Sequence, residues 1–248
     1  MGRALDGERC MRRYLIVDDN LDFAETVAEI LRDRGDDVGI AGGGEEAIAL
    51  ARGTRFDALL TDMRMPSMGG AEVVHEIRRI DPGLAALVIT GFAGDDQLEA
   101  ARREGLLAVL PKPVRVDHLL ALLDGARRDG LVAVVEDDAD FADNVCELLR
   151  GRGFAAVTAA SVLETERLGP VAPFCALVDL RVPGGPDGEA MRRLAARYPG
   201  LPMIVVTGLE AEAPIPHQGR FSKPFDSTTL LAALERLHAA RQPGPVPA

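Results

Sequence analysis

The sequence is poor in aromatic residues and cysteine and has no tryptophan. Aromatic side chains make up 4% of the 248 residues, so alanine, leucine and valine must supply most of the core. The three cysteines are scattered, without CxxC spacing, which fits a reducing cytosol rather than a disulfide framework. No run reaches the ~18 apolar residues of a membrane-spanning helix, and the N-terminus has no hydrophobic signal core. These absences predict a cytoplasmic protein without a membrane anchor.

Lysine is the scarcest basic residue, because Lys112 and Lys223 are the only two among 28 basic side chains. Against 39 acidic side chains, the net charge is −11. Sequence-independent binding to nucleic acid or to anionic membranes needs basic patches, and this balance argues against both. An apolar fraction of 47% with 27% charged residues is typical of a globular chain that buries a core.

Four short segments recur in the same order in the two halves, which indicates a duplicated domain of roughly 110–120 residues. The matching pairs are residues 14–23 with 132–141, 58–66 with 176–183, 87–91 with 205–208, and 111–113 with 222–224. We therefore expect an N-terminal extension over residues 1–11, a first domain over 12–128, a second over 129–240, and a disordered tail over 241–248.

Short apolar runs alternate with segments of helical period in each half. In the first half we expect strands over residues 14–17, 38–41, 58–61, 86–90 and 107–110, with further helices beginning near Glu45, Gly70, Asp95 and Arg115. Strands that are apolar throughout are buried on both faces, as in a parallel sheet. Five such strand–helix units in each half predict two doubly wound, flavodoxin-like α/β domains in tandem. Only residues 128–130 join the two domains, and so short a link predicts that the domains pack in a fixed position relative to each other.

Carboxylates gather where the predicted strands of the first half end. Asp18 and Asp19 follow the first strand, and Asp62 follows the third. Since these strand ends meet at one edge of the sheet, the carboxylates would repel one another unless a cation such as Mg²⁺ joined them. A carboxylate beside such a metal can attack phosphorus and form an aspartyl phosphate. Thr90 and Lys112, after the fourth and fifth strands, then contact the phosphoryl oxygens.

This ordered set resembles the receiver domains of two-component response regulators, and the resemblance covers about residues 12–240. The family pattern is an acidic pair, a phosphoacceptor Asp with Pro four residues later, a Ser or Thr, and Lys-Pro. In the first half it implies the metal pair Asp18 and Asp19, the phosphoacceptor Asp62, the metal-binding carbonyl of Arg64, and the phosphoryl contacts Thr90 and Lys112. In the second half it implies Glu136, Asp137, Asp179, the carbonyl of Arg181, Thr207 and Lys223 in the same order. The bond before the proline, here Pro113, is often cis in this family.

The second half is shorter between its threonine and its lysine, which lie 16 residues apart instead of 22. The missing residues fall where the first half has its predicted fourth helix, over 95–103. Pro214 and Pro216 occupy this part of the second half and cannot lie inside a helix. We therefore predict that the fourth helix of the second half is absent or reduced to one turn.

Receivers often carry an aromatic residue three positions before the lysine, whose rotamer follows the phosphoryl state. Val109 and Arg220 stand there in this sequence, so the signal must travel by threonine movement and loop repacking. A different motif, Gly42-x-Gly44 before a helix, is typical of dinucleotide loops. The second half lacks these glycines, and the adjacent Glu45 and Glu46 would repel a pyrophosphate, so we discount cofactor binding there.

The resemblance implies a signalling protein rather than an enzyme, one that accepts phosphoryl groups from a sensor histidine kinase or a histidine phosphotransferase. The repeats leave no DNA-binding domain, so output would pass through protein contacts, including a homodimer. One alternative is a pseudo-receiver scaffold in which one copy, the second in particular, is not phosphorylated. Another is a phosphatase of the aspartyl-phosphate type. Such enzymes often need Asp two residues past the nucleophile, where Arg64 and Arg181 stand here, and we disfavour it.

Overall fold

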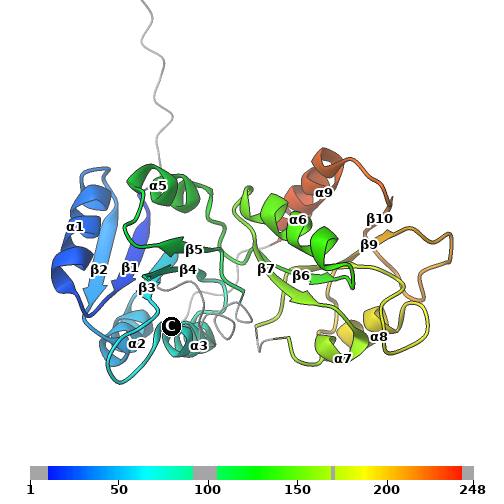
Figure 1. The fold of residues 1–248 in the computed structure, drawn as a ribbon, viewed down its shortest axis with the longest axis horizontal. Coiled ribbons are helices and arrows are strands. Elements are labelled where there is room, and N and C mark those ends of the chain that lie inside the picture. Colours follow the sequence, from blue (N-terminus) through cyan, green and yellow to red (C-terminus); the bar gives the residue numbers. More distant parts are fainter. Residues whose placement is uncertain (1–10, 92–104, 169–170, 242–248) are drawn as a thin grey trace, which may run out of the picture.

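The computed structural model describes residues 11–91, 105–168 and 171–241. Each half holds one parallel five-stranded sheet with helices on both faces (Figure 1). The strand order is β2-β1-β3-β4-β5 in the first sheet and, in the matching direction, β7-β6-β8-β9-β10 in the second. The predicted pair of flavodoxin-like α/β domains is confirmed. The expected extension and tail fall, apart from Met11 and Arg241, outside the described residues.

The first half follows the predicted order of strands and helices closely. Its elements are β1 (Arg13–Val17), α1 (Leu21–Arg32), β2 (Asp37–Ala41), α2 (Gly44–Gly53), β3 (Ala58–Asp62), α3 (Gly70–Ile80), β4 (Ala85–Thr90), β5 (Ala108–Pro111) and α5 (Val116–Gly125). Every expected strand lies within one residue of its predicted limits. The predicted fourth helix, over residues 95–103, lies outside the described residues.

The second half repeats this order with shorter helices on one face. Its elements are β6 (Leu131–Val135), α6 (Ala139–Arg150), β7 (Ala155–Ala159), α7 (Val162–Thr165), β8 (Cys175–Val178), α8 (Glu189–Arg197), β9 (Met203–Thr207), β10 (Gly219–Ser222) and α9 (Ser227–Ala239). Residues 208–218 are all described and contain no helix, as the two prolines predicted. Helix α7 has 4 residues against 10 in its counterpart α2, a difference that the sequence analysis did not predict.

Alternate residues of each strand pack on opposite faces of the sheet, which explains why the strands are apolar throughout. In β1, Tyr14 and Ile16 belong to the core cluster under α1 and α5. Leu15 and Val17 belong to the cluster under α2 and α3. Because both faces are covered, polar side chains of the central strands reach solvent only at the strand ends. The carboxyl ends of the strands are therefore the place for chemistry.

The link between α5 and β6 is hydrogen-bonded to both halves. The Arg128 guanidinium forms an ion pair with Asp81, with Nη2 at 2.5 and 2.7 Å from the two carboxylate oxygens. The Arg127 amide donates to the carbonyl of Gly153, in the second half, at 3.0 Å. Further contacts join Arg128 to Phe56, Asp129 to Gly83, His238 to the carbonyl of Arg128, and Arg241 to the carbonyl of Asp129. The link is thus fixed by side chains from both sides.

Candidate functional site

The predicted acidic residues of the first half meet at one edge of the sheet. Asp18 and Asp19 follow β1, and Asp62 is the last residue of the adjacent β3. The three side chains each offer a carboxylate oxygen, and these oxygens lie within 4.8 Å of one another. The Asp18 side chain is buried, whereas Asp19 is exposed. The grouping combines one solvent-facing and two more enclosed oxygen ligands, which suits a hard divalent cation.

Lys112 follows β5 and reaches into this acidic group. Its Nζ lies 2.8 Å from Asp18 Oδ2 and 2.9 Å from Asp62 Oδ2. Burial alone would lower the pKa of Lys112, but the hydrogen bonds and charges of the two carboxylates outweigh it and raise the pKa. The ammonium also lies over the ring of Phe23, 4.6 Å from its centroid. Lys112 therefore keeps its positive charge beside the predicted phosphoacceptor.

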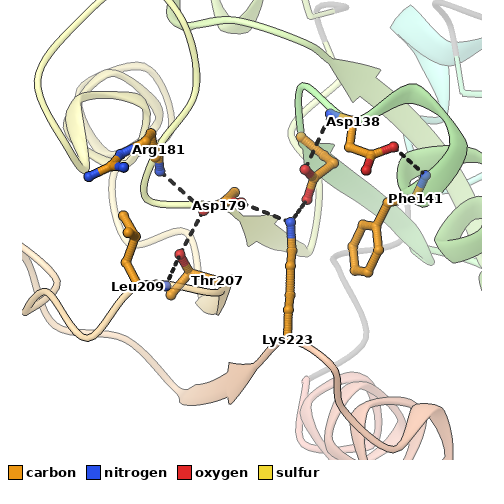
Figure 2. A network of polar contacts seen from close by, with 8 residues as sticks. Asp138, Phe141, Asp179, Arg181, Thr207, Leu209 and Lys223 are labelled. Carbon is orange, nitrogen blue, oxygen red and sulfur yellow. Dashed lines mark hydrogen bonds and ion pairs between the residues drawn. The ribbon is translucent and has the colours of Figure 1, made fainter.

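The second half builds the same arrangement with one longer carboxylate. Oxygens of Glu136, Asp137 and Asp179 lie within 4.8 Å of one another. Lys223 forms an ion pair with Glu136. It forms a second ion pair with Asp179, at 2.8 Å (Figure 2). Burial raises the pKa of Glu136, and the nearby Lys223 offsets this only in part. The Lys223 ammonium lies over the ring of Phe141, 4.2 Å from its centroid, in the same arrangement as Lys112 over Phe23.

The two threonines predicted to contact a phosphoryl group end β4 and β9. Thr90 and Thr207 are both buried. Thr207 donates its hydroxyl proton to Asp179 Oδ1 at 2.7 Å and accepts a hydrogen bond from the Leu209 amide at 3.3 Å (Figure 2). In the second half the predicted acceptor, Asp179, is therefore hydrogen-bonded to both the predicted threonine and the predicted lysine.

The two arginines with predicted metal-binding carbonyls follow β3 and β8. Arg64 and Arg181 each stand two residues past the acceptor, in the turn at the same edge of the sheet. The amide of Arg181 donates to Asp179 Oδ1 at 3.1 Å. The peptide bonds Lys112–Pro113 and Lys223–Pro224 are both cis, as expected for Pro113.

Some residues of the site were not predicted. The rings of Phe23 and Phe141 support the two lysines, and both lie in the first turn of the helix that follows the acidic pair. Their recurrence in the first repeated block was the available signal. Gly70 was also missed as a site residue, although a Cβ there would lie 2.2 Å from the carbonyl oxygen of Asp62. Only glycine leaves room for the backbone that carries the acceptor.

The family model for the response regulator receiver domain matches residues 14–124. A response regulator receiver protein of Anaeromyxobacter sp. (strain Fw109-5) is 74% identical over 237 residues, which cover 96% of this chain and 100% of that protein. The chain belongs to the response regulator receiver family. It is a signalling module, and its two sheets make two receiver-like domains. These are called receiver 1 and receiver 2 below.

Two further relatives match over about half of the chain. The transcriptional regulatory protein PdtaR of Mycobacterium tuberculosis is 36% identical over 116 residues, covering 46% of this chain and 55% of that protein. The receiver domain of the sensor histidine kinase PA1611 from Pseudomonas aeruginosa, solved with a magnesium ion in its active-site cleft, is 27% identical. The match covers 46% of this chain and 95% of the PA1611 receiver domain, with a TM-score of 0.43. Among the described residues, no helix is both long and apolar enough to cross a membrane.

Proposed function

We propose that the protein is a two-component response regulator that accepts phosphoryl groups on Asp62 of receiver 1 and Asp179 of receiver 2. The donor is the phosphohistidine of a sensor histidine kinase or a histidine phosphotransferase. The observation that carries the proposal is that an acidic triad paired with a lysine occurs twice, at matching strand ends. Output passes through protein contacts, in the cytoplasm, and a homodimer is one form that such contacts take.

The oxygens of both triads fit Mg²⁺. Carboxylates within 4.8 Å of one another are hard ligands of the kind this ion prefers, and the exposed Asp19 and Asp137 leave the sites open to water. In receiver 1 the ion would be held by Asp18, Asp19, Asp62 and the carbonyl of Arg64. In receiver 2 it would be held by Glu136, Asp137, Asp179 and the carbonyl of Arg181. When bound, the ion offsets the negative charge of the phosphoryl oxygens.

The residues of the chain account for the rest of the transfer. A carboxylate oxygen of Asp62 forms a bond to phosphorus while the bond from phosphorus to the imidazole nitrogen of the partner breaks. Lys112, held 2.9 Å from Asp62, moves with its flexible stem to pair with a phosphoryl oxygen. The Thr90 hydroxyl supplies a hydrogen-bond donor on the other side. Asp179, Lys223 and Thr207 perform the same roles in receiver 2.

A specific observation favours a second candidate function for receiver 2, that of a scaffold without phosphorylation. Glu136 replaces the aspartate that stands at the equivalent position of receiver 1, so its carboxylate lies at the end of a longer side chain. The pKa of Glu136 is raised by burial, so this carboxylate holds a proton, and releases a metal, more readily than an exposed one.

The test counts phosphoryl groups by intact mass after the full chain is incubated with Mg²⁺ and acetyl phosphate. We expect two additions to the wild type, one to Asp62→Asn, one to Asp179→Asn and none to the double variant. One addition that is lost in Asp62→Asn but kept in Asp179→Asn would assign receiver 2 to the scaffold function. No addition, together with no Mg²⁺ binding by calorimetry, would contradict the proposal for both receivers.

A further inference from the structure

Arg220 lies in β10 at the position that Val109 holds in β5. Arg220 is the register partner of Val205 in β9, and Val109 is the register partner of Val88 in β4. In both sheets the neighbouring strand ends two residues after this register partner, at Thr207 in β9 and at Thr90 in β4. The two receivers therefore differ at this matched position, because a guanidinium in receiver 2 takes the place of an isopropyl group in receiver 1.

The Arg220 side chain binds the backbone of residues 208–218, the segment without a helix. Nη1 donates to the carbonyl oxygen of Ala211 at 2.6 Å, and Nη2 donates to the carbonyl oxygen of Leu209. In a helix, these carbonyls would accept from amides four residues further on. Here the forked guanidinium takes over that role, because its fixed geometry lets it bond two carbonyls at once. Valine has no donor and cannot replace it.

Leu209 is also bonded to the threonine of the site. Its amide donates to the Thr207 hydroxyl, which in turn donates its proton to Asp179 (Figure 2). Thr207 has a relative exposure of 0%, so this hydroxyl has little access to competing water. A hydroxyl has one proton to donate, so any group that draws it away from Asp179 also reorients the acceptor of the Leu209 amide. The contacts join Asp179, Thr207, Leu209 and Arg220 in one path.

We propose that Arg220 is a positioning residue that couples residues 208–218 to the state of Asp179. This inference rests on the proposed function, because it requires a phosphoryl group on Asp179. Such a group brings charged oxygens that accept the Thr207 proton more strongly than the carboxylate oxygen does now. The hydroxyl then turns, and Leu209 follows it. Because Arg220 holds the carbonyls of Leu209 and Ala211 together, the segment responds as a unit.

The test uses the full chain with Asp62→Asn, so that acetyl phosphate and Mg²⁺ act on Asp179 alone. Hydrogen exchange of peptides covering residues 208–218 is compared with and without acetyl phosphate. The comparison covers three proteins, with arginine, lysine or valine at position 220. Arg220→Val copies receiver 1, and Arg220→Lys keeps the charge but not the fork. Peptides from β1 and α1 of receiver 1 are the control and should not respond.

With arginine at position 220, we expect phosphorylation to change the exchange rate of the segment by about fivefold or more, and by less than about twofold with valine. The lysine variant should respond weakly. The decisive quantity is the response to phosphorylation, which a merely structural role of Arg220 would leave unchanged. If Arg220→Val does not fold, the folded Arg220→Lys protein decides the question by the same comparison.

Intact mass of the same samples separates this inference from the proposed function. Phosphoryl addition to Asp179 in all three proteins, with an equal response of residues 208–218, would overturn the role of Arg220 alone. No addition in any of the three would overturn the proposed function of receiver 2, and the inference with it.

Discussion

Lys112 Nζ lies 2.9 Å from the carboxylate of Asp62, in a chain in which 26 of the 28 lysine and arginine residues are arginine. A compact ammonium on a flexible stem fits between Asp18 and Asp62, whereas a planar guanidinium is wider and bonds in a fixed fork. Both lysines of the chain therefore stand beside a predicted phosphoacceptor, since Lys223 occupies the matching place beside Asp179.

The first prediction concerns the exchange of this lysine for arginine. Lys112→Arg should slow phosphorylation of Asp62 by acetyl phosphate by about tenfold or more, because the charge is kept but misplaced at the acceptor. Asp179 in the same molecule should react at the wild-type rate. The measurement is a time course of phosphoryl additions, read per site by peptide mass. Equal slowing at both sites would point to a general loss of structure instead.

A second prediction compares two glycines that follow the first helix of each receiver. Gly35 and Gly153 both have positive φ, +84° and +77°. A Cβ at Gly35 would meet nothing within 4 Å, whereas one at Gly153 would lie 1.7 Å from the carbonyl oxygen of Gly125, at the end of α5. Gly35→Ala should cost roughly 1–2 kcal/mol of stability from backbone strain alone. Gly153→Ala should cost about 1–3 kcal/mol more, from overpacking between the receivers.

Urea unfolding followed by circular dichroism checks this pair. A loss of stability in Gly153→Ala no larger than that in Gly35→Ala would contradict the close approach of α5 to the turn after α6.

A third prediction concerns the pH dependence of the stability of α9. Hydrogen bonds from Thr229 and Thr228 to the Asp226 carboxylate hold its pKa below the usual value. A carboxyl group whose pKa is lower in the folded state than in the unfolded state contributes its full stabilisation at pH values above the unfolded-state pKa. This contribution is lost as the pH falls through the folded-state pKa. Asp226→Asn keeps a cap without the charge. The wild type should therefore exceed Asp226→Asn in stability at pH 6, and this excess should shrink toward pH 3.

Urea titrations of both proteins at several pH values measure that excess. Asp226→Ala is the matched control, because it removes the cap at every pH. A stability difference between wild type and Asp226→Asn that stays constant from pH 6 to pH 3 would show that the carboxylate charge does not contribute.

A fourth prediction concerns the buried thiols. Burial raises the pKa of Cys175 to about 12 and also raises the pKa of Cys146. The thiolate is the reactive form, so neither residue should react with iodoacetamide at pH 8 in the folded protein. In a Cys10→Ser background, both should react after unfolding in guanidinium chloride. Rapid alkylation of Cys175 under native conditions would contradict the packing of β8.

The sheets and the acidic sites could be predicted from the sequence because both depend on short patterns of residues along the chain. Apolar runs specify buried strands, and parallel strands bring their ends together, so Asp18 and Asp62 could be placed side by side without a structure. The proline pair Pro214 and Pro216 likewise predicted a segment without a helix. Each of these inferences needs only chain chemistry and the topology rule for parallel sheets.

The remaining features depend on contacts between distant residues, which the sequence alone does not specify. The shortness of α7 was also not predicted, although Gly169 and Pro170, which follow Thr165 by four and five positions, were a local signal in the sequence against a longer helix. The bonds from Arg220 to Leu209 and Ala211 span 11 and 9 positions and need a specific loop path. The contacts of Arg128 with Asp81 and Phe56 are equally non-local.

The matching strand orders of the two sheets have an experimental consequence. Each receiver experiences the same buffer, concentration, phosphodonor and temperature as its neighbour in the same molecule. A rate at Asp62 divided by the rate at Asp179 is therefore free of errors in protein concentration or donor age. The natural differences at two matched positions, Asp18 against Glu136 and Val109 against Arg220, can then be measured as ratios within one sample. The duplication makes each site the internal standard of the other.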